Sequence, residues 1–502
     1  MKAYRIGKVQ LPWTNLIPPL HKLQRTLGDN IDEETVASDL GSDSDWSAST
    51  LASSVDLEAE ILKSTCDRIS SAEELAPGVC SRKPYTAQDE DLCSALEAKL
   101  PALTKTKSLT RDEYTANCEQ DEIDSDVLDY PSLDLETQEA ISREYSALHE
   151  RIKKEGFYVC RYSEYGKDSI RWAILFAAFI YLLQAKWYLT SAMFLGAFWQ
   201  QIMFTAHDAG HRGITGNFVK DTLIGAFVAD FCCGLSIGWW KSSHNVHHLV
   251  TNMPEHDPDL QNVPLFATSP SYFKSVLSTF YNFTFVWDAA ADFMVRFQKY
   301  TYYPVMALAR FNLYFLSWCH LLSPRSQSLG SAWWTKPVEI AFMSCYWAIF
   351  GYGLVWRTLP DWPTRVAFVM ISHCFTMLLH VQITLSHWGM PTADLGPGES
   401  FPQRQLRTTM DVDCPAWLDW LHGGLQFQVI HHLFPRVPRH NLRALQVLVR
   451  EFCDKTHIKY KCYGFVEGNH IVLSRLEEVT KMAETLVQCQ LYMARTGESG
   501  LH

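Results

Sequence analysis

Three short histidine clusters are the part of this 502-residue sequence best suited to chemistry. They read HDAGH at 207–211, HNVHH at 244–248 and QVIHH at 428–432. On a helix, residues three or four positions apart share a face, so the histidines of one cluster can point toward one ion. Because neutral imidazole is a common metal ligand, the spacing predicts a metal centre. The same spacing places Gln428 near it.

The number of ligands indicates more than one ion. The clusters supply seven histidines, namely His207, His211, His244, His247, His248, His431 and His432. A structural zinc needs four ligands and a catalytic zinc three plus water, so seven indicate two metals. Soluble di-iron bundles use carboxylates that these clusters lack. Imidazole ligation and oxygen chemistry favour iron, although spacing alone leaves zinc and manganese open.

Further polar residues lie near the clusters. We expect His387, which follows the last apolar stretch, to be an additional ligand. His380, two turns earlier, fits either a ligand or a buried core residue. Asp208 lies inside the first cluster and is expected near the metal. In the segment EHDPD at 255–259, Asp257 and Asp259 could orient the imidazoles of the second cluster through their N–H groups, with His256 also behind the ligands. A solvated turn is the equal alternative.

The apolar stretches that must position these clusters predict two membrane hairpins. Residues 172–185 and 187–206 carry no charge and are separated by one lysine. Residues 340–356 and 366–385 form a second pair joined by a short polar loop. A membrane span needs about 20 predominantly apolar residues, so each pair can cross the bilayer and return.

Two weaker apolar stretches are not expected to cross. Residues 222–240 contain Asp230, and residues 303–322 contain Arg310. A charge at the centre of the bilayer costs roughly 2.5–3.5 kcal/mol. We therefore expect both stretches to be interfacial or re-entrant.

The number of membrane crossings decides on which side of the bilayer the histidine clusters lie. Two hairpins that each cross twice leave all three clusters on one face, as a shared metal site requires. Lysine and arginine are plentiful before the first hairpin and near the clusters, so this face is cytosolic by the positive-inside rule. The expected fold is an all-α integral membrane protein with four transmembrane helices in two hairpins, a cytosolic di-metal-binding cap and interfacial helices.

Charge and composition divide the chain further. The net charge is −11, and residues 29–60 contain ten acidic residues and no lysine or arginine, which argues against a nucleic-acid-binding protein. We expect residues 1–129 to be a largely disordered acidic region. Residues 130–465 would then form the membrane domain and residues 466–502 a cytosolic tail. The 14 cysteines form no CxxC pair and indicate a reducing compartment.

The clusters resemble the three histidine boxes of the membrane-bound fatty-acyl desaturase family. A glutamine at the first position of the last box, here Gln428, is typical of its front-end branch. The flanking segments GLSIGWWKSSHNVHHLVTNMPEHDPDLQ and DVDCPAWLDWLHGGLQFQVIHHLFPRVPRHNLR are similar to fungal Δ8-sphingolipid desaturases. The similarity covers residues 130–465, which would be the membrane desaturase domain.

The resemblance implies a function and a cellular place. Two irons would be held by the seven box histidines and His387, with Gln428 close to the site. With O2 as co-substrate, the enzyme would introduce a double bond into the long-chain base of a ceramide or related sphingolipid. Cytochrome b5 and its reductase would supply the electrons. The protein would lie in the endoplasmic reticulum membrane as a multi-pass protein with its active site facing the cytosol.

The sequence departs from the front-end pattern in one respect. Relatives usually carry an N-terminal cytochrome b5 domain with an HPGG motif, which is not found here. We therefore expect either a cytochrome b5 supplied in trans or a sequence truncated at its start.

Other functions remain open at this stage. A front-end fatty-acid desaturase is the main alternative substrate class. A lipid hydroxylase on the same scaffold would present the same site. A non-enzymatic metal transporter would line its ligands along the bilayer path, and a haem carrier would need only two axial histidines.

Overall fold

The computed structural model describes residues 110–323 and 332–496, so most of the acidic N-terminal region lies outside the described residues. The described chain is mainly helical. Its strands form only two short pairs. Strands β1 (Val276–Ser278) and β2 (Phe283–Phe285) are antiparallel, and β3 (Asp411–Asp413) and β4 (Cys462–Gly464) are parallel.

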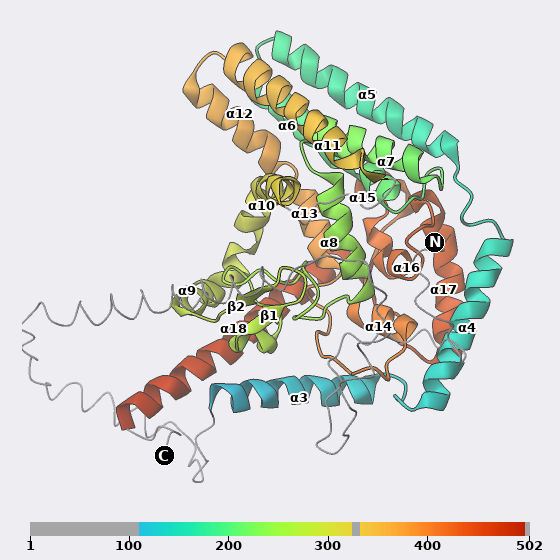
Figure 1. Ribbon diagram of the computed structural model, residues 1–502, viewed down its shortest axis with the longest axis vertical. Helices are drawn as coiled ribbons and strands as arrows, with labels where there is room; N and C mark the ends of the chain where they lie inside the picture. Colours follow the sequence, from blue (N-terminus) through green and yellow to red (C-terminus); the bar gives the residue numbers. More distant parts are fainter. Residues whose placement is uncertain (1–109, 324–331, 497–502) are drawn as a thin grey trace, which may run out of the picture. The chain divides into compact units, whose positions relative to one another are not determined.

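One apolar core joins the long helices expected to enter the membrane. Helix α6 (Tyr188–Gly210) packs against α5 (Tyr162–Gln184) and α12 (Trp362–Cys374), as Figure 1 shows. Trp199 lies at the centre of this core and is almost fully buried. The neighbouring elements are α7 (Phe218–Ala226), η3 (Phe227–Cys232), α8 (Ile237–Leu249), α10 (Gln298–Leu322), α11 (Thr335–Tyr346), η8 (Trp347–Thr358) and α13 (Met377–Leu385).

By length and apolar composition alone, three described helices could cross a membrane. They span Ala289–Leu322, Thr335–Thr358 and Trp362–Leu385. Two further helical segments, Phe218–Cys232 and Ile237–Leu249, are together long and apolar enough for one span, but they are bent by 115° relative to each other. The second predicted hairpin is therefore among the candidates, and the bend agrees with the re-entrant element predicted there.

The candidate spans differ from the sequence prediction in two places. The first predicted hairpin, α5 and α6, is not among them, because the charge-free part of α5 is short and two buried glutamines, Gln200 and Gln201, make α6 less apolar. The stretch containing Arg310 was expected not to cross the membrane, yet its length and apolar composition are sufficient for a span. The Arg310 guanidinium is buried, donates hydrogen bonds to the Cys233 carbonyl and the Tyr314 hydroxyl, and lies over the Trp199 ring.

A second core lies around α17 (Leu442–Thr456) and α4 (Leu135–Lys154). The apolar residues of α17 recur at helical spacing, so one face of it is buried. The buried face consists of Leu442, Leu445, Leu448, Val449 and Phe452. It supports α14 (Phe401–Thr408), η9 (Ala416–Leu418), α15 (Asp419–His422), η10 (Leu425–Phe427), α16 (Gln428–Leu433) and η11 (Arg439–Asn441).

The described end of the predicted acidic region is helical. Residues Arg111–Asp129 form helix α3, which starts at a capping box between Thr110 and Glu113. Acidic residues of α3 pair with bases from distant segments, such as Asp126 with Arg407 at 2.6 Å and Glu119 with Lys274 at 3.0 Å. Composition did not predict α3, because it does not reveal these tertiary partners.

The predicted C-terminal tail is part of the folded protein. Helix α18 (Phe465–Thr496) buries Val472, Leu476 and Val479 against other elements. Its partners include η4 (Pro270–Phe273), α9 (Ala289–Met294), η5 (Val295–Phe297) and the start of α10. The amide of Gln298 donates to the Leu476 carbonyl at 2.8 Å.

Candidate metal centre

Eight predicted ligands gather at one place in the fold. His207 and His211 end α6, and three histidines lie on α8. His387 follows α13, and the last two lie on α16. The ring centroids of His207 and His431, from segments more than 200 residues apart, are 4.5 Å apart. Tertiary folding thus unites clusters that the sequence keeps separate.

The ligand atoms form two groups. The first histidine group consists of His207, His211, His244 and His431. The second consists of His247, His387 and His432. Within each group, one nitrogen per residue lies within 4.8 Å of the others. Two groups of imidazoles fit two separate ions.

His248 lies between these groups. Its Nε2 is 3.0 Å from Nε2 of His244, in the first group. Its ring is stacked on that of His432, in the second group, with centroids 4.2 Å apart. His248 can therefore serve either ion.

The unpartnered nitrogens suit a metal. Buried Nε2 atoms of His211, His431 and His432 have no hydrogen-bond partner within the described part of the chain, and neither has Nδ1 of His387. A buried polar atom without a partner costs about 1–3 kcal/mol, and a bound cation would remove that cost. Burial, and then neighbouring imidazoles, lower the pKa of His431 and His432 well below the usual value. The lone pairs are therefore available to a metal.

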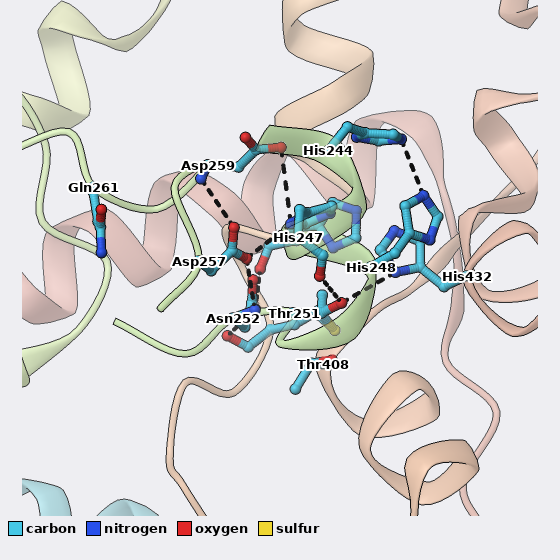
Figure 2. Close-up of polar contacts among 12 residues, drawn as sticks. His244, His247, His248, Thr251, Asn252, Asp257, Asp259, Gln261, Thr408 and His432 are labelled. Carbon is cyan, nitrogen blue, oxygen red and sulfur yellow. Dashed lines mark hydrogen bonds and ion pairs between the residues drawn. The ribbon is translucent and has the colours of Figure 1, made fainter. Parts of the chain in front are cut away.

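The second group is oriented by residues outside it. Nδ1 of His247 donates to the Asp257 carboxylate at 2.8 Å (Figure 2). The same carboxylate accepts the backbone N–H of Asn252 at 2.8 Å and that of Asp259 at 2.9 Å. The Asp259 side chain is further away, 3.8 Å from the same His247 nitrogen. With Nδ1 engaged in this way, Nε2 of His247 is left for a metal.

Gln405 on α14 holds His432 in the same manner, and sequence reasoning missed it. Its Oε1 lies 2.9 Å from Nδ1 of His432 and accepts a hydrogen bond from the Thr251 hydroxyl at 3.0 Å. Its Nε2 donates to the His248 carbonyl at 3.0 Å. Gln405 therefore links the second and third clusters. No spacing rule could have found it, because α14 is separate from both in sequence.

Asp208 of the first cluster connects α6 to η11. Its Oδ1 is 3.7 Å from Nδ1 of His207, and its Oδ2 accepts hydrogen bonds from the Tyr165 hydroxyl and from Arg439. Arg439 also pairs with Asp168 on α5. This buried network holds the end of α6 against the segment that follows the third cluster. Sequence reasoning also did not predict that Arg439 and Tyr165 belong to the site.

Three other predicted residues lie outside both groups. His256 is buried, and its Nδ1 is 2.9 Å from the Thr279 hydroxyl rather than near the metal groups. His380 is buried on α13, with Nε2 3.4 Å from the Thr376 hydroxyl. Gln428 begins α16 and lines the neighbouring cavity. His380 lines the same cavity.

A cavity of about 610 Å³ adjoins the histidines. Its walls come from α6, α8, α10 and α13, together with the β1–β2 hairpin and the segment before α16. Apolar side chains such as Leu313, Leu316 and Ile383 line it, while His207, His244 and His431 reach it from the metal groups. A largely apolar cavity with a few convergent polar groups fits a long alkyl chain.

Comparisons with known proteins agree with this geometry. Residues 185–464 match the family model described as fatty acid desaturase. The chain is 44% identical to a Delta 8-(E)-sphingolipid desaturase of Emericella nidulans, covering 100% of this chain and 87% of that protein. It is 45% identical to one of Kluyveromyces lactis, covering 98% and 84%. A Delta(8)-fatty-acid desaturase of Helianthus annuus is 36% identical, covering 69% and 75%.

Proposed function

Because this chain belongs to the fatty acid desaturase family, we propose that it introduces a Δ8 double bond into the long-chain base of a ceramide or related sphingolipid. The chain is an oxidoreductase of lipid metabolism. The observation that carries the substrate assignment is identity of 41–45% to fungal proteins named Delta 8-(E)-sphingolipid desaturase, over nearly all of this chain.

Two irons fit the donor set. The first histidine group would hold one iron and the second the other, with His248 between them. When bound, the irons and O2 supply the oxidising power that removal of hydrogen from an unactivated methylene requires. Overall, the two hydrogens of the chain, two electrons and two protons reduce one O2 to two waters. The electrons would come from cytochrome b5 and its reductase in trans.

The residues of the chain contribute position and exclusion of water. Asp257 and Gln405 fix two imidazoles through their outer nitrogens, so the ligand atoms are set before any metal arrives. The apolar walls hold the alkyl chain so that one methylene pair lies nearest the histidines. Tight placement of the chain, rather than a side-chain acid or base, would therefore decide where the double bond forms.

The proposed topology places the centre on the cytosolic face of the endoplasmic reticulum membrane. Helices α5 and α6 form one hairpin, and α11–η8 with α12–α13 form the other. The ligands at the end of α6 and just after α13 then lie on the same side. The basic residues Arg161 and Lys167 precede the first crossing, which favours the cytosol for this side.

A second candidate is a front-end fatty-acid desaturase. Two relatives favour it, the Delta(8)-fatty-acid desaturase of Helianthus annuus and an Acyl-lipid (9-3)-desaturase of Borago officinalis. They are 36% and 35% identical and cover 69% and 60% of this chain. The fungal relatives cover more of it at higher identity, so the sphingolipid substrate is preferred.

A lipid profile tests the proposal. The chain is expressed in a yeast that lacks Δ8-unsaturated sphingolipids, with and without added cytochrome b5, and the long-chain bases are analysed by mass spectrometry. His247→Ala and His431→Ala should abolish the product while the protein stays in the membrane. His470→Ala, a matched control at an exposed position of α18, should retain it.

Each outcome bears on a separate part of the proposal. Full activity in the His247 or His431 variant would contradict the metal assignment. Unsaturation confined to fatty-acyl chains would favour the second candidate. If a strain that has no cytochrome b5 forms the product without added cytochrome b5, the assignment of cytochrome b5 as the electron donor is contradicted.

A further inference from the structure

The segment from β1 to the start of α10 exposes an unusual number of large apolar side chains. Within 24 residues these are Leu277, Phe283, Val286, Phe293, Phe297 and Tyr300. Phe283 is 60% exposed. Phe293 and Phe297 contact each other, with ring centroids 5.4 Å apart. Exposed apolar groups of this kind mark a surface that contacts lipid or another protein.

The apolar composition of the adjoining helices favours lipid. Ala289–Leu322 comprises 34 residues and is apolar enough to meet the hydrocarbon core of a bilayer. In the proposed two-hairpin topology this segment does not cross the membrane, and it is interrupted at η5 (Val295–Phe297). An apolar segment that meets the membrane without crossing it lies at the interface. The N-terminal part, including α9, is therefore placed in the headgroup layer.

The residues of this N-terminal part suit the headgroup layer. Phe297 and Tyr300 are aromatic and exposed, and Arg296 is exposed beside them. Aromatic residues concentrate at membrane interfaces, and basic side chains extend toward lipid headgroups. Meanwhile Gln298 and Tyr303 are bound to α18, through Leu476 and Asn469. The side of the segment that carries Gln298 and Tyr303 is therefore held by α18, and the side that carries Phe297 and Tyr300 is left for lipid.

The β1–β2 hairpin connects this surface to the cavity. Tyr281, Phe283 and Phe285 line the same cavity that His207 and His431 reach. Phe283 is both a cavity wall and an exposed residue. Phe283 therefore lies between the cavity and the exterior, and the cavity adjoins the exposed apolar surface at this point.

We propose that the β1–β2 hairpin and α9 rest in the headgroup layer and form a mouth through which a membrane lipid passes its long chain to the histidines. This inference rests on the proposed function and adds the source of the substrate. The alkyl chain never enters water, whose contact with methylenes is unfavourable. The polar head stays at the interface, near Asn262 and Tyr281, which are polar residues of the cavity wall. A substrate already in the bilayer, rather than a soluble thioester, is the expected occupant.

Photochemical crosslinking in membranes tests the mouth directly. p-Benzoylphenylalanine replaces Phe283 in one variant and Val447 in another, within the full-length chain in yeast microsomes. Both native residues are 60% exposed, but Val447 lies on α17, away from the candidate spans. After irradiation, adducts are identified by mass spectrometry. We expect phospholipid and sphingolipid adducts at position 283 and none at 447.

The readout does not depend on metal or activity. Lipid adducts at both positions, or at neither, would overturn the proposal that the β1–β2 hairpin admits lipid to the cavity. A wild-type chain that yields no unsaturated base would refute the proposed function while leaving the crosslinking result intact. The two failures are therefore distinguishable.

A second measurement uses activity. Phe293→Asp should lower conversion of long-chain ceramide in vesicles at least tenfold, because Phe293 is 64% exposed on α9 and a charge there opposes contact with lipid. It should leave conversion of a water-soluble short-chain ceramide within twofold, since Phe293 does not line the cavity. Val447→Asp should leave both unchanged. Equal loss of both activities in Phe293→Asp would contradict a role in lipid entry.

Discussion

Asp257 and His247 form a buried pair, in which the carboxylate Oδ2 lies 2.8 Å from the imidazole Nδ1. Both residues lie in one local segment, ten positions apart. The carboxylate is itself fixed by two backbone N–H groups. The direction of the His247 ring is therefore set by the chain around it. This fixed ring is what allows its other nitrogen to meet His387 and His432 in the second group.

Asp257→Asn is expected to lower metal affinity by about ten- to a hundredfold, because partners that orient a ligating histidine contribute this much. The amide still accepts a hydrogen bond but no longer carries charge. Metal per chain is measured after equilibration at graded free Fe²⁺. Asp259→Asn is the control and should have a smaller effect, since its carboxylate is 3.8 Å away and partly exposed. Equal affinity in wild type and Asp257→Asn would show that the pair does not position a ligand.

Gln405→Leu is expected to reduce bound iron from two per chain toward one. The leucine cannot accept from His432 or donate to the His248 carbonyl, so the ring of His432 loses its orientation. Metal analysis and Mössbauer spectra of the purified protein report the loss. Gln403→Leu is a close control, because Gln403 is equally buried on α14 but bonds to Gln138 instead. A similar loss in both variants would indicate general damage to α14 rather than positioning.

Asp411 predicts a pH dependence of stability. Burial raises the pKa of its carboxyl to about 7, against hydrogen bonds from the Tyr460 hydroxyl and the Val429 N–H. The folded state thus binds a proton that the unfolded state releases above about pH 4. The free energy of unfolding should therefore fall as the pH rises from 4 to 7, by roughly 4 kcal/mol in total, and then level off.

The measurement is denaturant unfolding in detergent at several pH values. Asp411→Asn should remove most of this slope, because the amide does not titrate. Asp413→Asn, at an exposed position of the same strand, should keep it. A slope unchanged in Asp411→Asn would assign the pH dependence to another group.

Arg407→Met should destabilise the protein by roughly 3–5 kcal/mol, since removal of one partner leaves buried charges uncompensated. Arg407 is fully buried and pairs with Glu399 at 2.7 Å and Asp126 at 2.6 Å. Arg151→Met, which removes an exposed pair with Glu451, should change stability little. Thermal unfolding in detergent compares the two. Comparable small effects would mean that α3 is held by other contacts.

Much of the candidate metal centre was predictable because its candidate ligands are arranged locally. His207 and His211 are one helical turn apart, and so are His244 and His248. This spacing identifies residues that share one helix face without knowledge of the fold. The support of His247 by Asp257 also follows from a short separation along the chain. His387 was predicted from its place just after the last apolar stretch, although it is more than 40 residues from its neighbour His432.

What surrounds the histidines depended on long-range contacts. His380 is close in sequence to His387 yet lies outside both groups, because α13 turns its side chain toward Thr376 and the cavity. The role of Gln405 arises only where α14 packs between the second and third clusters. Asp126 and Arg407 are 281 residues apart, so the order of α3 could not be read from its acidic composition.

The sequence by itself determined the candidate ligands, their helical spacing and the family, because these reside in short contiguous motifs. The tertiary structure decided how the histidines divide into two groups and which polar side chains orient them. It also decided where the cavity lies. The physical reason is that helix periodicity acts over a few residues, whereas the packing of helices brings together side chains hundreds of residues apart.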